Sequence, residues 1–199
     1  MEPIKSTNTA QNMPKMSLLD HIWEWVKIIA IALIISLPIR FFIAEPFIVK
    51  GASMDPTFAT GQFLIVDRLT YRLNEPNRGD VIVFQYPNDP SKYYIKRIVG
   101  LPEESINIKD GVVTITNKNS SSTPTILREP YVKDIHRSYD NINIDLNQTE
   151  YFVMGDNRLE SSDSRVWGPL EKHFIVGRPI LRILPVTSLS ILPGEYKTK

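Results

Sequence analysis

The sequence predicts a mainly β protein, in which an N-terminal transmembrane helix precedes an antiparallel β-sheet domain with a small β accessory lobe. Three observations predict this class. The chain of 199 residues has only one long apolar segment, close to its N-terminus. After Ser53, apolar residues recur with period two in short runs, which is typical of strands. Fifteen prolines, eight tyrosines and eight phenylalanines are typical of a body rich in turns and strands.

The apolar segment is predicted to be a transmembrane anchor of residues 18–44, preceded by a polar tail of residues 1–17. The nineteen residues Val26–Ala44 carry charges only near the two ends, and about twenty apolar residues are needed to cross a bilayer. A cleaved signal peptide and a buried core helix are the alternatives. Lysine and arginine are nearly balanced between the two flanks, so charge alone does not orient the segment.

Seven runs of residues are predicted to be strands, because they combine apolar patterning with β-branched and aromatic residues. The pair Asp110-Gly111 is the strongest hairpin signal in the chain. Residues 45–104 and 149–199 are assigned to the main sheet domain, and residues 105–148 to the accessory lobe. The predicted strands are Phe63–Leu69, Asp80–Tyr86, Tyr93–Val99, Ser105–Lys109, Val112–Asn117, Glu150–Met154 and Ile175–Leu184.

Composition excludes several kinds of site. The 23 basic and 22 acidic residues nearly cancel, which gives no reason to expect nucleic acid as a partner. The chain has no cysteine, which excludes disulfides, thiolate metal sites and a cysteine nucleophile. His21, His136 and His173 do not form the His-x-x-x-His pair of a zinc protease. Composition therefore excludes thiolate metal sites and a zinc protease site of this type.

The segment Gly51–Thr57 directly follows the apolar segment and contains Ser53 among small residues. Pro56 fixes its own φ and biases Asp55 toward an extended conformation, so we expect an extended strip with an accessible Ser53 hydroxyl. A serine becomes a good nucleophile only when a base takes its proton. On this segment alone, a Gly/Pro-rich loop leaving a helix is the simpler interpretation.

A lysine could be that base if its amine were kept out of water. Its ordinary pKa of about 10.4 leaves almost no neutral amine at neutral pH, and burial can lower that pKa by several units. Lys96 lies inside the apolar run Tyr93–Val99, on the same face as Tyr94 and Ile98. On this run alone, an edge-strand lysine with its amine in water is the simpler interpretation.

A third segment, Gly155–Pro169, is rich in Asp, Asn and Ser, which bond readily to nearby backbone and are typical of capped turns. Asp163 and Arg165 within this one irregular loop indicate a fixed structure. A hydroxyl beside a neutral lysine could orient the amine, and either Ser161 or Ser162 could supply it.

Three blocks, Gly51–Thr57, Tyr94–Pro102 and Gly155–Gly168, follow the apolar segment in this order. Together they resemble the signature segments of the bacterial type I signal peptidases, and the resemblance extends to about Pro185. It implies a membrane-bound endopeptidase with a Ser–Lys dyad. The implied partners are signal peptides of exported preproteins and the lipid bilayer, without metal, cofactor or nucleic acid. The implied location is the plasma membrane, single-pass, with residues 1–17 in the cytoplasm and the catalytic domain on the extracytoplasmic side.

The resemblance also implies roles for individual residues. Ser53 is the implied nucleophile, and its backbone N–H is an oxyanion donor. Lys96 is the implied general base, and Ser161 orients it. The implied structural ion pair consists of Asp163 and Arg165, with Arg97 as a third member. The implied pocket residues, which receive small side chains at substrate positions −1 and −3, are Val49, Met54, Tyr94 and Ile95.

Two features depart from the family pattern, and two other functions compete. Gly51 stands where some members carry a hydroxyl that helps to bind the oxyanion, and Glu103 stands where glycine is frequent. One competing function is a catalytically inactive, membrane-tethered β-module that binds exported chains, but Ser53 and Lys96 are both retained. The other is a self-cleaving Ser–Lys protease of related fold, which would have a DNA-binding domain in place of residues 1–45.

Overall fold

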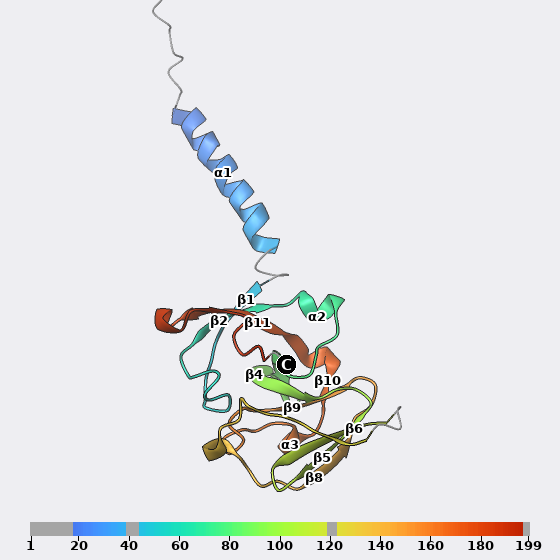
Figure 1. Cartoon of the computed structure of the whole chain (residues 1–199). Helices are drawn as coiled ribbons and strands as arrows, with labels where there is room; N and C mark the ends of the chain where they lie inside the picture. Colours follow the sequence, from blue (N-terminus) through green and yellow to red (C-terminus); the bar gives the residue numbers. More distant parts are fainter. Residues whose placement is uncertain (1–17, 39–43, 119–122, 197–199) are drawn as a thin grey trace, which may run out of the picture. The chain divides into compact units, whose positions relative to one another are not determined.

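In the part of the chain that the structure describes, a long N-terminal helix precedes a mainly antiparallel β body (Figure 1). The computed structural model describes residues 18–38, 44–118 and 123–196. Residues 40–199 form one compact unit, and the helix belongs to a separate unit that ends at residue 39. The predicted mainly β class is therefore confirmed.

The helix α1 (Leu18–Pro38) has 21 residues. Within the described ranges, no helix has both the length and the apolar character that crossing a membrane requires. The predicted tail of residues 1–17 and part of the predicted anchor, residues 39–43, lie outside the described residues. The assignment of Ala44 to the anchor was wrong, because this residue begins the first strand.

The larger sheet has eight strands, and all of its strand pairs are antiparallel. Its order is β1-β2-β11-β3-β4-β9-β10, and β12 also pairs with β11. Two one-turn helices, α2 (Thr70–Leu73) and α3 (Ser164–Trp167), lie in the connections. The strands are β1 (Ala44–Ile48), β2 (Phe63–Asp67), β3 (Val81–Tyr86), β4 (Asp89–Gly100), β9 (Glu150–Met154), β10 (Leu170–Glu171), β11 (Ile175–Leu184) and β12 (Ser190–Ile191).

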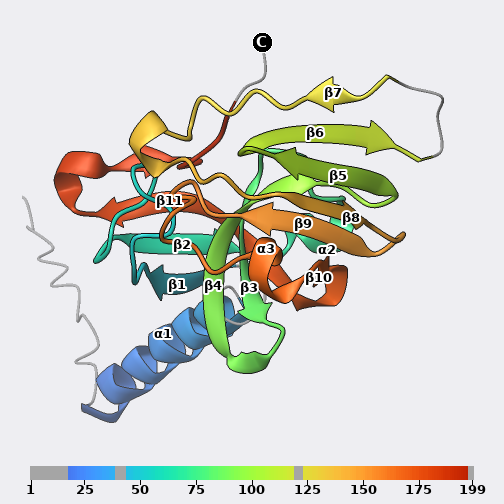
Figure 2. The same ribbon diagram turned by 90° about the horizontal axis from the view of Figure 1, so that it is seen from below.

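The smaller sheet has four antiparallel strands in the order β7-β6-β5-β8. These strands are β5 (Glu104–Lys109), β6 (Val112–Asn117), β7 (Thr125–Ile126) and β8 (Ile142–Asp145). Figures 1 and 2 show this sheet beside β9. A buried apolar cluster joins the two sheets, with Ile106 and Ile108 of β5 packed with Phe152 and Met154 of β9. Because they share this core, the two sheets are parts of one compact unit.

The seven predicted strands all occur, and their differences from the prediction have tertiary causes. Asp110 and Gly111 have φ values of 50° and 76°, as the predicted hairpin between β5 and β6 requires. β4 begins earlier than predicted, because Asp89 already pairs with Tyr86 across the hairpin from β3. β1 was not predicted, since this short edge strand is defined by its pairing with β2 rather than by its own pattern.

The burial of β4 changes along its length, and this change positions the site. The first half of the strand is largely exposed, whereas the five residues Lys96–Gly100 are all buried. Ile95 packs against a cluster of buried residues that carries the Ser53 turn from beneath: Val49, Met54, Phe58, Leu64 and Val81. Lys96 is therefore the first buried residue of β4, and it directly follows Ile95, which packs against the core of the Ser53 turn.

Candidate active site

The segment that carries Ser53 is folded into tight turns, and the prediction of an extended strip was wrong. The N–H of Asp55 donates to the carbonyl of Ala52 at 3.0 Å, and the N–H of Phe58 donates to that of Met54 at 2.9 Å. The physical reason is burial: the side chains of Met54 and Phe58 are 1% and 0% exposed, so the chain must curl to place both in the core. Ser53 itself is half-buried.

Ser53 and Lys96, which are 43 residues apart, meet at hydrogen-bond distance. The Lys96 Nζ donates to the Ser53 Oγ at 2.7 Å and to the carbonyl of Ile95 at 3.0 Å. The backbone of Ser53 is held independently, because its carbonyl accepts the N–H of Asn157 at 3.0 Å. The hydroxyl and the amine are therefore placed by separate elements, the first by the turn and the β9–α3 loop, and the second by β4.

The environment of Lys96 favours its neutral form. Lys96 is only 4% exposed. The pKa of Lys96 is lowered to about 8, chiefly by burial; the charge of Arg165 also lowers it, whereas the carboxylates of Asp163 and Asp156 raise it. A lysine with this pKa can exchange a proton near neutral pH.

A pocket of about 260 Å³ opens beside the two side chains. Three of the four predicted pocket residues, Val49, Tyr94 and Ile95, line it. The fourth, Met54, does not, because it is buried in the core beneath the Ser53 turn. The remaining lining residues are Phe47, Ile48, Lys50, Gly51, Ala52, Ser53, Leu64, Val83, Tyr93, Lys96, Glu160 and Ser162.

The structure places Ser161 close to the dyad but does not pair it with Lys96. The Ser161 Oγ is buried and has no hydrogen-bond partner among the described residues. The prediction that Ser161 orients the lysine is therefore not matched by a hydrogen bond. Gly155 permits this crowding, because a Cβ at that position would lie 2.3 Å from the Ser53 carbonyl oxygen and 2.4 Å from the Ser161 Oγ.

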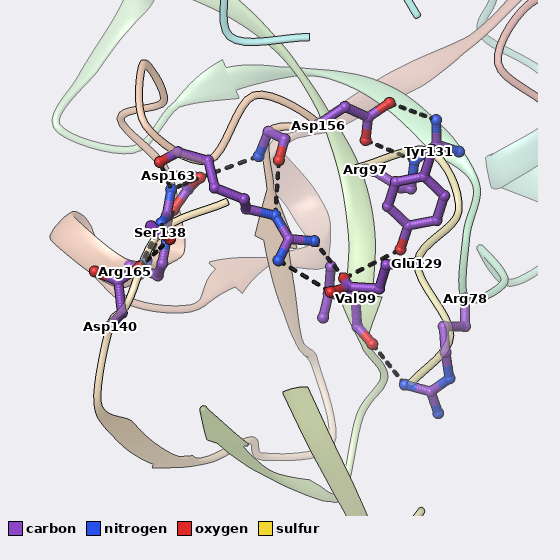
Figure 3. Close-up of polar contacts among 12 residues, drawn as sticks. Arg78, Arg97, Val99, Glu129, Tyr131, Ser138, Asp140, Asp156, Asp163 and Arg165 are labelled. Atoms are coloured by element: carbon purple, nitrogen blue, oxygen red, sulfur yellow. Dashed lines mark hydrogen bonds and ion pairs between the residues drawn. The ribbon is translucent and has the colours of Figure 1, made fainter. Parts of the chain in front are cut away.

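The predicted pairing of Asp163 with Arg165 is present and well buried (Figure 3). The Arg165 Nε and Nη2 each donate to one oxygen of the Asp163 carboxylate at 2.8 Å. The second Asp163 oxygen also accepts the N–H of Gly155 at 3.0 Å. On the other side, Arg165 pairs with Asp140 and bonds to Ser138, so the loop after β9 is tied to the segment before β8.

Arg97 does not join this pair, so its predicted membership was wrong. Its guanidinium instead makes a bidentate pair with Asp156, with Nε to Oδ1 at 2.8 Å and Nη2 to Oδ2 at 2.7 Å. The reason is strand geometry: Lys96 and Arg97 are consecutive on β4, so their side chains leave opposite faces. The ring of Tyr131 lies 4.1 Å from the Arg97 guanidinium carbon (Figure 3).

Sequence reasoning missed two residues that connect the elements of the site. Asp156 accepts a hydrogen bond from the Thr57 Oγ1 at 2.5 Å as well as the pair from Arg97, so it joins the Ser53 turn to β4. Asn157 joins the same turn to the loop after β9, because its N–H donates to the Ser53 carbonyl. The available signal was their position directly after the apolar strand β9, where an acidic and an amide residue end up buried.

The comparisons with known proteins establish the family of this chain. A family model described as signal peptidase, peptidase S26, matches residues 22–184. The chain belongs to this family. The predicted relation to the bacterial type I signal peptidases is thereby confirmed, and the chain is a serine peptidase, a hydrolase.

Individual relatives cover most of the chain. A probable signal peptidase I-1 of Synechocystis sp. is 33% identical over 184 residues, which are 89% of this chain and 90% of the relative. Signal peptidase I of Bacillus licheniformis is 35% identical over 168 residues, 79% of this chain and 86% of the relative. The crystal structure of a signal peptidase I from Enterococcus faecalis V583 is 26% identical, with a TM-score of 0.44 over 53% of this chain and 97% of that one.

Proposed function

We propose that this chain is a membrane-bound serine endopeptidase that cleaves N-terminal signal peptides from exported preproteins with a Ser53–Lys96 dyad. One observation carries the proposal. The amine of Lys96, a residue that is 4% exposed, lies 2.7 Å from the hydroxyl of Ser53, beside an open pocket. Family membership supports the reaction class and the substrate class.

The lowered pKa of Lys96 makes it the base for the first step. With a pKa of about 8, roughly one amine in five is neutral at pH 7.4, against roughly one in a thousand for an ordinary lysine. The neutral amine accepts the Ser53 proton while the Oγ bonds to the scissile carbonyl carbon. The carbonyl π electrons move onto the oxygen, and the backbone N–H of Ser53 donates to this oxyanion.

The same amine completes the reaction. When the tetrahedral intermediate collapses, the C–N bond breaks, and the Lys96 ammonium gives its proton to the leaving amine. Lys96, neutral again, then takes a proton from the water that attacks the Ser53 ester. Breaking the ester C–O bond releases the product as a carboxylic acid, which loses its remaining proton to water, and the proton held by Lys96 returns to the Ser53 oxygen.

The pocket suits an extended peptide with small side chains near the cleavage site. Its walls come from Val49–Ser53 on one side and Tyr93–Lys96 on the other, and most of its other lining residues are apolar. An extended substrate can lie along such walls through main-chain hydrogen bonds, with alternate side chains entering the pocket. Small residues at positions −1 and −3 then occupy the same side.

The exposed surface of α1 supports attachment to lipid. Thirteen large apolar side chains on this helix are 46–77% exposed, and large exposed apolar surfaces require a partner. In the proposed function this partner is the bilayer, which holds the body of residues 44–196 on the extracytoplasmic side. Signal peptides carry an apolar segment of their own, so a membrane-bound enzyme meets them where they emerge.

The test is cleavage of a preprotein by the detergent-solubilised full chain. We expect Ser53→Ala and Lys96→Ala to lose activity by about a thousandfold or more, because each removes one half of the proton transfer. Lys92→Ala is the matched control, since this lysine of the same strand has a side chain that is 64% exposed and should be replaceable within twofold. Equal processing by all four proteins would contradict the proposal and favour a module that only binds exported chains.

A further inference from the structure

The rim of the pocket carries two charges that the peptidase mechanism does not use. Of the described residues that line the pocket, three are charged: Lys96, Lys50 and Glu160. Lys96 already has a role as the base of the proposed dyad. Lys50 and Glu160 are both exposed and come from different elements, the connection after β1 and the loop after β9. Glu160 is the one carboxylate among these lining residues.

Glu160 is held in a fixed position relative to the nucleophile. Its N–H donates to the Asn157 Oδ1 at 3.3 Å, and the N–H of Asn157 donates to the Ser53 carbonyl at 3.0 Å. Arg158 and Asp163, on either side of the short loop, are buried and anchored by ion pairs. The backbone of Glu160 is therefore anchored, and two hydrogen bonds connect it to Ser53 through Asn157. The side chain of Glu160 is exposed to solvent.

We propose that Glu160 is a specificity residue that favours a basic substrate side chain at one of positions −2, +1 or +2, next to the scissile bond. The inference rests on the proposed peptidase function. Side chains of an extended peptide alternate in direction, so the residues between those that enter the pocket pass its rim. A lysine or arginine there meets the Glu160 carboxylate, and a glutamate or aspartate is repelled by it. Lys50 acts with the opposite sign on the same rim.

Glu160 does not act through the base. The charges that move the pKa of Lys96 are those of Asp163, Asp156 and Arg165, and Glu160 is not among these causes. Neutralising Glu160 should therefore change which substrates are preferred without moving the pH dependence of cleavage. This separates a role in specificity from a role in positioning the dyad.

The experiment uses peptides that carry Lys, Gln or Glu at positions −2, +1 and +2, one position at a time, around one constant cleavage site. For the wild type we expect kcat/KM to be roughly tenfold higher for Lys than for Glu at one of these positions at low ionic strength, and less in 0.5 M salt, because rim charges are screened. Glu160→Gln should bring this ratio to one or below, since the remaining rim charge is positive. Lys50→Gln should raise it.

The controls separate the possible failures. Asp110→Asn removes one carboxylate from an exposed turn remote from the pocket lining and should leave every ratio unchanged. The peptide with Gln at all three positions should be cleaved with the same pH midpoint by all variants, because none of them removes a charge that shifts the pKa of Lys96. If Glu160→Gln keeps the wild-type ratios at all three positions, the specificity role is overturned while the peptidase stands. If the wild type cleaves none of the peptides and no preprotein, the proposed function itself fails.

Discussion

Lys96 and Arg97 are neighbours on β4, both are buried cations, and their surroundings are opposite. Arg97 is 1% exposed and has a bidentate carboxylate partner in Asp156, together with the carbonyls of Gly79 and Gly194. Lys96 is 4% exposed, and its amine bonds to a hydroxyl and to one carbonyl. A buried charge with its counter-ion stays charged and holds elements together, whereas a buried amine without one moves toward its neutral form.

The largest effect on activity should come from Lys96→Arg, which gives both positions an arginine. In Lys96→Arg the guanidinium cannot release its proton at working pH, so no base faces Ser53. We expect cleavage of a preprotein to fall by about a thousandfold or more, while the far-ultraviolet circular dichroism stays that of the wild type. Activity within tenfold of the wild type would mean that another group takes the Ser53 proton.

Among these variants, loss of the Arg97 guanidinium, the ion-pair partner of Asp156, should reduce the free energy of unfolding most. Arg97→Met leaves the Asp156 carboxylate, which is 0% exposed, without its ion pair, and breaking a buried pair in this way typically costs about 3–5 kcal/mol. Denaturant unfolding of the solubilised chain measures the free energy of unfolding. Lys92→Met breaks an exposed pair with Asp89 and should cost less than about 1 kcal/mol. Similar losses in the two variants would contradict the contrast.

Lys96 should, in contrast, reduce stability at neutral pH. Its folded-state pKa of about 8 lies below the unfolded value of 10.5, so the penalty for burying the ammonium is fully present below pH 8. Lys96→Met should therefore be more stable than the wild type by up to about 3 kcal/mol at pH 7. This difference in stability should shrink as the pH rises from 8 to 10.5. Above that range Lys96 is neutral in both the folded and the unfolded wild type. A difference independent of pH would show that packing, not charge, is responsible.

The smallest effect should come from the charges around the amine. The Asp163 carboxylate raises the pKa of Lys96 and Arg165 lowers it. Asp163→Asn should therefore move the midpoint of the kcat/KM profile to lower pH, and Arg165→Gln should move it to higher pH. At pH 7 the gain in neutral amine is at most about tenfold, because roughly one amine in ten is already neutral there. The direction in which the pH midpoint of kcat/KM shifts is the quantity to measure. The absolute rate is less informative, because both variants also weaken the buried Asp163–Arg165 pair.

The sequence predicted the parts of this protein that depend on local pattern. The strand β11 and the hairpin around Asp110-Gly111 follow from alternation and from turn chemistry. The strip around Ser53 was predicted incorrectly, because the burial of Met54 and Phe58 in a shared core overrides the local preference for an extended chain. The partner of Arg97 was also predicted incorrectly, since pattern alone does not tell which carboxylate lies under a given strand face.

By itself the sequence determined the β class, the order of the strands along the chain, and the family, through three short blocks of residues. The tertiary structure decided how these blocks contact one another. It brings the Ser53 hydroxyl and the Lys96 amine, which are 43 residues apart, to 2.7 Å, and it surrounds that amine with protein rather than water. The physical reason is that strand periodicity is a property of neighbouring residues. The pKa of a lysine depends on every charge and dipole around it, and these come from segments far apart in the chain.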